Sequence, residues 1–187
     1  MPRSRMVVRL LLSLLTFMGF VAVHAVEPDD VEGLQAWWTA DTLGLANAAK
    51  VEGWPDRSGN KHDLTYADGV APDFYDNWIN GGPVVYVREG TMAVADPFVL
   101  NDHTIFLVYR ADGAPRKGLF HGAAESQGVV LQDGEERRDV YHGANTVTAY
   151  NTSSPEAKDF RISVLGRKGA AFRSWLNGKD ISSGAEL

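Results

Sequence analysis

The stretch Thr104–Arg110, which reads TIFLVYR, decides the fold class of this chain. It is filled by β-branched and aromatic residues, which favour an extended strand. Both of its alternating residue sets are apolar, so we expect a central, buried strand in a sheet that is covered on both faces. The first face is expected to carry Ile105, Leu107 and Tyr109, and the second Phe106 and Val108.

The sequence on either side of this strand repeats the same β pattern. Short apolar or alternating runs lie between turn signals, and the chain holds 19 Gly and 8 Pro. Asn177-Gly178 directly follows one such run and predicts a type I′ hairpin turn. Further strands are expected at Leu34–Trp38, His62–Tyr66, Val84–Arg88, Leu119–Gly122, Val129–Gln132, Val140–His142, Thr146–Tyr150, Phe160–Leu165 and Ala171–Leu176. The sequence therefore predicts an all-β fold, an antiparallel sandwich.

The first 25 residues have the three parts of a secretory signal peptide. Arg3, Arg5 and Arg9 precede an almost wholly apolar run that ends at Val23, and Val23-His24-Ala25 gives a cleavage site after Ala25. The run is about 14 residues long, shorter than the roughly 20 that a spanning helix needs. We therefore expect a signal at 1–25, a short linker at 26–32 and one β domain at 33–187, secreted or held in the periplasm or cell envelope.

The net charge of the chain limits its possible partners, and the absence of cysteine limits how the fold can be stabilised. The chain has a net charge of −6, and removal of the signal takes away three arginines and no acid, which leaves −9. A surface of this sign disfavours nucleic acid and anionic membranes, so we expect neither as a partner of the mature protein. There is no cysteine, so the domain must fold on core burial without disulfides.

Two segments resemble a known family. Gly33–Asp41 (GLQAWWTAD) looks like the opening strand of bacterial laminin G-like domains of the concanavalin A-like lectin and glucanase superfamily. Trp54–Asp63 is similar to that family's W-x-D-x-S-G-N segment. The resemblance implies a jelly-roll sandwich and a carbohydrate or cell-surface polymer as ligand. Those domains add strands beyond an Asn-Gly hairpin, so we expect the domain to be incomplete at its C-terminus, with Leu187 near an unfinished sheet.

Asp56, Ser58 and Asn60 are the candidate metal ligands. They place oxygen atoms at alternate positions, as calcium loops often do. The alternative is that Asp56 and Ser58 cap their own turn through side-chain to backbone hydrogen bonds. Arg88 stands where the family commonly has an acid, which weakens the case for calcium nearby. We expect weak calcium binding at most, and no other cofactor.

Aromatic side chains are the candidate ligand-binding residues, because an exposed ring can stack on the C–H face of a sugar. The candidates are Trp38, Trp78 and Tyr141. Trp37 and Trp38 are adjacent, so on a strand they would face opposite ways and only one would belong to the core. Packing against a loop is the alternative for each aromatic residue.

No catalytic pattern is evident. The alternating acidic run of the superfamily's glucanases is missing, and Asp133–Glu136 reads as a solvated loop. We therefore expect a non-catalytic binding or adhesion module for carbohydrate or another polymer. The alternatives are a structural domain of the envelope or of an extracellular assembly, and a divergent glycan hydrolase.

Overall fold

The computed structural model describes residues 27–110, 117–120, 129–133, 138–142, 145–149, 160–180 and 182. The prediction of a signal peptide at 1–25 and the expectation for Leu187 lie outside these residues. Of the predicted solvated loop Asp133–Glu136, the last three residues also lie outside them, whereas Asp133 is the last residue of the strand Val129–Asp133. The side chains of the strands between 117 and 149 also lie outside them, apart from Phe120.

The described chain is built from antiparallel strands and two short 3-10 turns. The strands are β1 (Gly53–Trp54), β2 (Leu64–Asp68), β3 (Asp73–Ile79), β4 (Gly82–Tyr86), β5 (Thr91–Val94), β6 (His103–Tyr109), β7 (Lys117–Phe120), β8 (Val129–Asp133), β9 (Arg138–His142), β10 (Asn145–Ala149), β11 (Arg161–Lys168), β12 (Ala171–Leu176) and β13 (Lys179–Asp180). The 3-10 turns are η1 (Pro28–Asp30) and η2 (Ala40–Thr42). The all-β, antiparallel prediction is confirmed.

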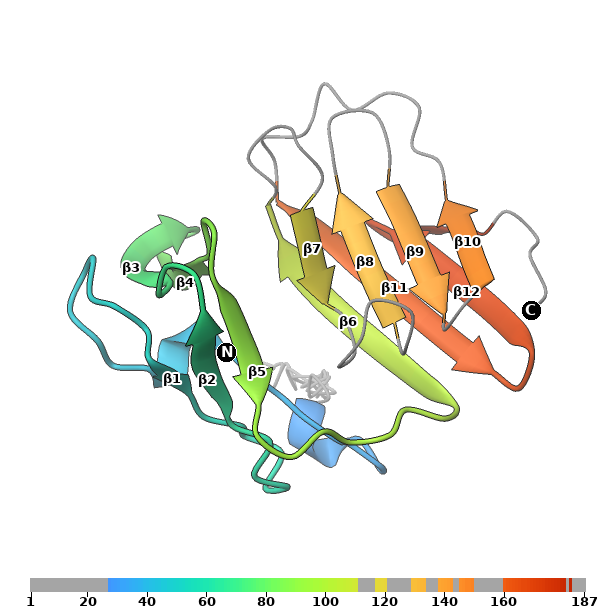
Figure 1. Cartoon of the computed structure of the whole chain (residues 1–187), viewed down its shortest axis with the longest axis horizontal. Helices are drawn as coiled ribbons and strands as arrows, with labels where there is room; N and C mark the ends of the chain where they lie inside the picture. Colours follow the sequence, from blue (N-terminus) through green and yellow to red (C-terminus); the bar gives the residue numbers. More distant parts are fainter. Residues whose placement is uncertain are drawn as a thin grey trace, which may run out of the picture.

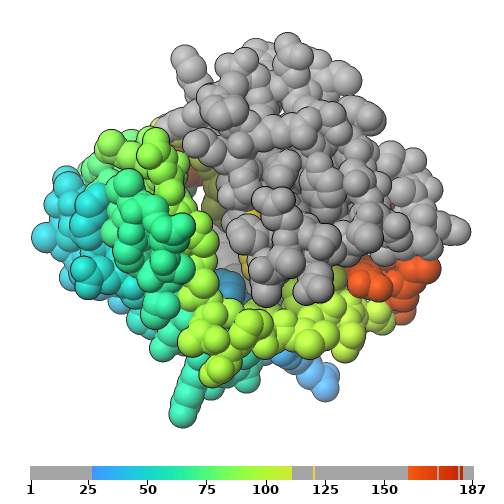
Figure 2. Space-filling view, viewed as in Figure 1, coloured from blue at the N-terminus to red at the C-terminus, as the bar shows by residue number. Residues whose placement is uncertain are grey.

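These strands form four sheets. Their orders are β1-β2-β5, β3-β4, β10-β9-β8-β7 and β13-β12-β11-β6. In Figure 1 the N-terminal strands β1 to β5 lie to the left, and β7 to β10 are drawn in front of β11 and β12 on the right. The residues of β1 to β5 also form a continuous surface at the left of Figure 2.

Two Asn-Gly turns fix the hairpins. Asn177 and Gly178 both have positive φ, 51° and 79°, and connect β12 to β13 as the sequence predicts. Asn80 and Gly81, with φ of 47° and 81°, connect β3 to β4 in the same way. Positive φ at both central residues is the geometry of a type I′ turn, whose twist matches that of the flanking strands.

The core of the C-terminal sheet is centred on β11. Leu165 is 0% exposed, and Ser163 on the same face is also fully buried. Strand register places Leu165 between Ile105 of β6 and Ser174 of β12. This face of the sheet, which also carries Leu176, is therefore the one that is covered.

The prediction that Thr104–Arg110 forms a central, buried strand is wrong. The strand exists, but β6 is the last of its sheet and pairs with β11 alone among the described strands. The two expected faces are correct, yet Phe106 and Val108 are 70% and 67% exposed. An apolar run shows that both faces of a strand are apolar, and it does not show that both faces are covered.

The predicted strand Leu34–Trp38 is also not observed. The segment runs extended without joining a sheet. Its backbone groups bond instead to a turn about twenty residues later: the carbonyls of Leu34 and Gln35 accept from Asn60 Nδ2, and the N–H of Trp37 donates to Asp56. These side-chain bonds replace the strand ladder that the composition of the segment favours.

Two glycines allow neighbouring loops to touch backbone to backbone. Gly69 follows β2 and Gly90 precedes β5. A Cβ at Gly69 would overlap the carbonyl oxygen of Glu89, and one at Gly90 would overlap that of Val70, both far inside van der Waals contact. Gly69 also has φ of +82°, which side-chain-bearing residues rarely adopt.

We expect Gly90→Ala to lower the free energy of unfolding by about 2–3 kcal/mol, because backbone atoms must move to admit the methyl group. Chemical denaturation of the purified protein measures this. Gly53→Ala is the matched control, since a Cβ there lies no closer than 4.0 Å to the carbonyl oxygen of Leu64. Equal stability of the two variants would contradict the observed loop contact.

Candidate functional site

Asp56 is the centre of a hydrogen-bonded turn. Its Oδ1 accepts the backbone N–H groups of Trp37 and Ser58, each at 2.9 Å. Its Oδ2 accepts the Ser58 hydroxyl at 2.7 Å and the His62 N–H at 3.0 Å. The turn-capping interpretation of Asp56 and Ser58 is therefore confirmed.

The three candidate metal ligands lie together, with their polar groups directed at the protein. The Ser58 hydroxyl accepts the N–H of Asn60 at 3.2 Å, and Asn60 Nδ2 donates to the carbonyl of Leu34 at 2.8 Å. A calcium ion at Asp56 would have to displace the four donors that its carboxylate accepts. Within the described residues, no group of three or more His, Cys, Asp or Glu side chains is placed to hold a metal.

The pKa of Asp56 reflects these contacts. Partial burial raises the pKa of the carboxyl, but the hydroxyl of Ser58 and the backbone N–H groups of Ser58, Trp37 and His62 together outweigh it. The pKa therefore lies below its usual value, because these donors favour the charged form.

The tryptophans next to this turn hold the opening segment in place. Trp38 Nε1 donates to the carbonyl of His62 at 2.9 Å, and Trp54 Nε1 donates to that of Thr39 at 3.0 Å. The Arg57 guanidinium lies over the Trp37 ring, 4.0 Å from its centroid. Trp38 is half-buried, so the structure places this candidate in a loop contact rather than on an open surface.

A second cluster, on β3 and β4, gathers three aromatic rings. The rings of Tyr75 and Trp78 have centroids 4.5 Å apart, and Tyr86 lies 5.6 Å from Trp78 and 6.2 Å from Tyr75. Trp78 is 43% exposed. We call Tyr75, Trp78 and Tyr86 the aromatic cluster.

The β3–β4 hairpin brings the aromatic cluster together. Its register pairs Asp73 with Tyr86 and Tyr75 with Val84, so Tyr75 and Tyr86 share a face. The register then shifts between Tyr75 and Ile79, which is a bulge or irregularity around Trp78. A bulge redirects the side chains next to it. The Trp78 ring, which lies within the register shift, is beside the rings of both tyrosines.

Two arginines flank the aromatic cluster. The Arg110 guanidinium lies 5.4 Å from the centroid of Trp78, and that of Arg88 lies 5.3 Å from the centroid of Tyr86. Arg88 is also 3.8 Å from the carboxylate of Asp73, to which Lys50 binds at 2.6 Å. Cations above the ring faces are favourably placed for cation–π attraction.

A shallow pocket of about 370 Å³ opens beside the aromatic cluster. Its lining combines two ring faces with short amide and carboxylate side chains, which are donors and acceptors suited to hydroxyl groups. The lining residues are Asn47, Tyr75, Asp76, Asn77 and Trp78. Asn47 also accepts the backbone N–H of Asp76 through Oδ1, at 3.4 Å.

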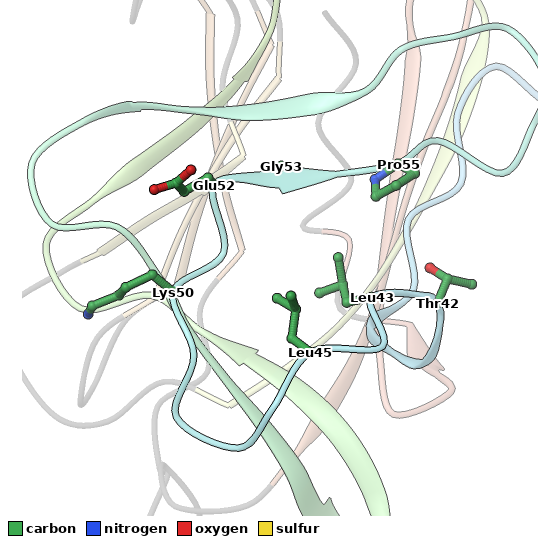
Figure 3. A pocket seen from close by; sticks show the side chains of 7 residues that line it. All are labelled: Thr42, Leu43, Leu45, Lys50, Glu52, Gly53 and Pro55. Atoms are coloured by element: carbon green, nitrogen blue, oxygen red, sulfur yellow. The ribbon is translucent and has the colours of Figure 1, made fainter.

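Another hollow, of about 300 Å³, lies between β1 and the loop after η2 (Figure 3). Leu43 and Leu45 project into its middle, and Lys50 and Glu52 lie at one end. The Lys50 ammonium is already bound to Asp73 and to the carbonyl of Ala71. This hollow is lined by aliphatic, hydroxyl and charged side chains, whereas the lining of the pocket beside Trp78 includes two aromatic residues.

The two sequence-predicted ligand residues whose side chains are described, Trp38 and Trp78, do not come together. Trp78 lies in the aromatic cluster, Trp38 lies at the Asp56 turn, and the side chain of Tyr141 is outside the described residues. Tyr86 was missed. The signal was available in Asn80-Gly81, because a hairpin turn between two aromatic segments places their rings opposite each other.

Comparisons with known proteins give this chain no family. No family model, curated protein or solved structure matches it. Among the described residues, no helix is long and apolar enough to cross a membrane.

Proposed function

We propose that this chain is an exported, non-catalytic binding module that recognises carbohydrate through the aromatic cluster. The observation that carries the proposal is the half-exposed Trp78 ring, which packs on Tyr75 and lines a pocket with amide and carboxylate groups. An aromatic face adapts to the apolar C–H face of a sugar, and the polar groups fit its hydroxyls.

Export is part of the same proposal. It is supported by the basic N-terminus, the short apolar run after it and the small residue at Ala25. The resemblance of Gly33–Asp41 and Trp54–Asp63 to laminin G-like domains supports a jelly-roll winding and a polymer ligand. The acidic net charge of −6 favours neutral glycans over anionic ones.

A glycan array followed by titration calorimetry tests the proposal. We expect the protein to bind a subset of glycans, and Trp78→Ala to weaken binding of the best oligosaccharide at least tenfold, which corresponds to about 1.4 kcal/mol. The reason is that the substitution removes the partly exposed indole ring of Trp78.

Phe106→Ala is the matched control, because it removes an exposed ring from another sheet. It should leave the titration of a monovalent oligosaccharide unchanged. Array binding that survives Trp78→Ala would place the ligand elsewhere. A protein that binds neither the array nor neutral polysaccharides in affinity electrophoresis would refute the proposed function.

A second candidate function is a structural domain of an extracellular assembly. The observation that favours it is the exposure of Phe106, Val108 and Ile162 on one face of the C-terminal sheet. Exposed apolar patches commonly mark contact surfaces.

A further inference from the structure

Trp78 lies in a part of the β3–β4 hairpin that the strand ladder does not hold. The regular pairing stops at Tyr75 and Val84 and resumes at Ile79. Between these positions three residues of β3, including Trp78, lie opposite Pro83 alone, which has no backbone N–H to donate. The orientation of the Trp78 ring therefore depends on contacts made by side chains.

One contact to the Trp78 ring comes from another sheet. Arg110 directly follows β6, and its guanidinium lies 5.4 Å from the centroid of the Trp78 ring. The other two rings of the aromatic cluster, those of Tyr75 and Tyr86, belong to the same hairpin as Trp78. Arg110 thus connects the aromatic cluster to the sheet that contains β6 and β11.

Arg110 is itself placed by the end of the β6–β11 ladder. Tyr109 and Arg161 form the last pair of that ladder, and Arg110 and Phe160 extend the two strands by one residue each. The Arg110 guanidinium lies 5.6 Å from the centroid of the Phe160 ring, and both residues are partly buried. A guanidinium in a partly buried position gains more from attraction to aromatic rings than a fully solvated one.

We propose that Arg110 is a positioning residue of the carbohydrate site, whose guanidinium holds the Trp78 ring in the orientation that receives the sugar. The inference rests on the proposed function, because it assigns a role within the same site. A ring that is fixed before the sugar arrives loses less conformational freedom on binding, so the affinity is higher. The site is then composite, since the ring comes from β3 and the residue that holds it from the end of β6.

Titration calorimetry with three neutral oligosaccharides, cellohexaose, laminarihexaose and maltohexaose, tests the effect on affinity. We expect Arg110→Ala to weaken binding of the best of them by about threefold or more, as the loss of one cation–π contact predicts. Arg110→Lys retains the cation, and its affinity should lie between those of Arg110→Ala and the wild type. Arg57→Ala is the matched control, because it removes a guanidinium 4.0 Å from the ring centroid of Trp37, outside the aromatic cluster. It should leave the affinity unchanged.

Acrylamide quenching of tryptophan fluorescence tests the position of the ring without any sugar. The chain has five tryptophans, so the signal of Trp78 is taken as the difference between each protein and the same protein carrying Trp78→Phe. Arg110→Ala should make this difference signal easier to quench, because the guanidinium no longer covers the indole. Arg110→Lys should show a smaller change, and Arg57→Ala none.

The two measurements separate this inference from the proposed function. Weaker binding with unchanged quenching would overturn the positioning role, because Arg110 would then contact the sugar directly. Unchanged binding by Arg110→Ala would also overturn it and would leave the proposed function intact. A wild type that binds none of the three oligosaccharides would count against the proposed function, whereas quenching would still decide whether Arg110 positions Trp78.

Circular dichroism verifies that each variant is folded. If Arg110→Ala is not, Arg110→Gln takes its place, since it removes the charge and keeps a long side chain. The same outcomes then apply.

Discussion

Leu165→Ala is expected to lower the free energy of unfolding by about 2–5 kcal/mol, the range for deleting a fully buried leucine. Leu165 is 0% exposed at the centre of β11, between β6 and β12. Neighbouring strands hold the backbone on both sides, so the cavity left by the side chain cannot readily collapse. The measurement is chemical denaturation followed by circular dichroism.

The control for Leu165→Ala is Val99→Ala, which removes apolar atoms from a side chain that is 80% exposed. It should change the stability by less than about 0.5 kcal/mol. If Leu165→Ala is as harmless as Val99→Ala, β11 is not the core strand of its sheet.

Asp56→Ala is expected to lower the free energy of unfolding by about 3 kcal/mol. It removes the acceptor for four donors at once, and unpaired donors in a partly buried turn are costly. The loss should loosen the attachment of the opening segment, so the fluorescence of the adjacent tryptophans should change as well. Asp96→Ala, at an exposed carboxylate, should leave both the stability and the fluorescence unchanged.

The contribution of Asp56 should also depend on pH, with a defined sign. Its folded-state pKa lies below the unfolded value of roughly 3.9. The stabilisation is therefore fully present above the unfolded pKa, and it is lost as the pH falls through the folded one. The stability difference between wild type and Asp56→Asn should be constant near neutral pH and shrink in acid. A difference that grows in acid would contradict the observed hydrogen bonds.

The elements whose signals lie within a few neighbouring residues were predictable from the sequence. Ala171–Leu176 was predicted with the bounds of β12, and Asn177-Gly178 forms the expected turn, because both signals lie within a few residues. β3 was missed because it carries Asp73, Asp76 and Asn77, which are depleted in strands. Pairing with β4 overrides that propensity.

Contacts between residues far apart in the sequence could not be predicted from the sequence alone. The TIFLVYR run identifies a strand, but its place at the edge of a sheet depends on which other strands reach it. Leu34–Trp38 has the composition of a strand, yet Asp56 and Asn60 take its hydrogen bonds. In the same way Trp78 could be selected as a candidate, whereas its contact with Tyr86 depends on the register of a hairpin.

The pairing of β6 with β11 has a consequence for the order in which the chain folds. The paired residues that are closest in sequence, Tyr109 and Arg161, are 52 positions apart. Closing so long a loop has an entropic cost that contacts formed early in folding do not offset. Between them, the described strands β7 to β10 pair with their sequence neighbours alone, and β12 pairs with its sequence neighbours β11 and β13. Such hairpins form quickly. The β7–β10 meander should therefore form first and bring β6 and β11 within reach, which makes their docking the slow step of folding.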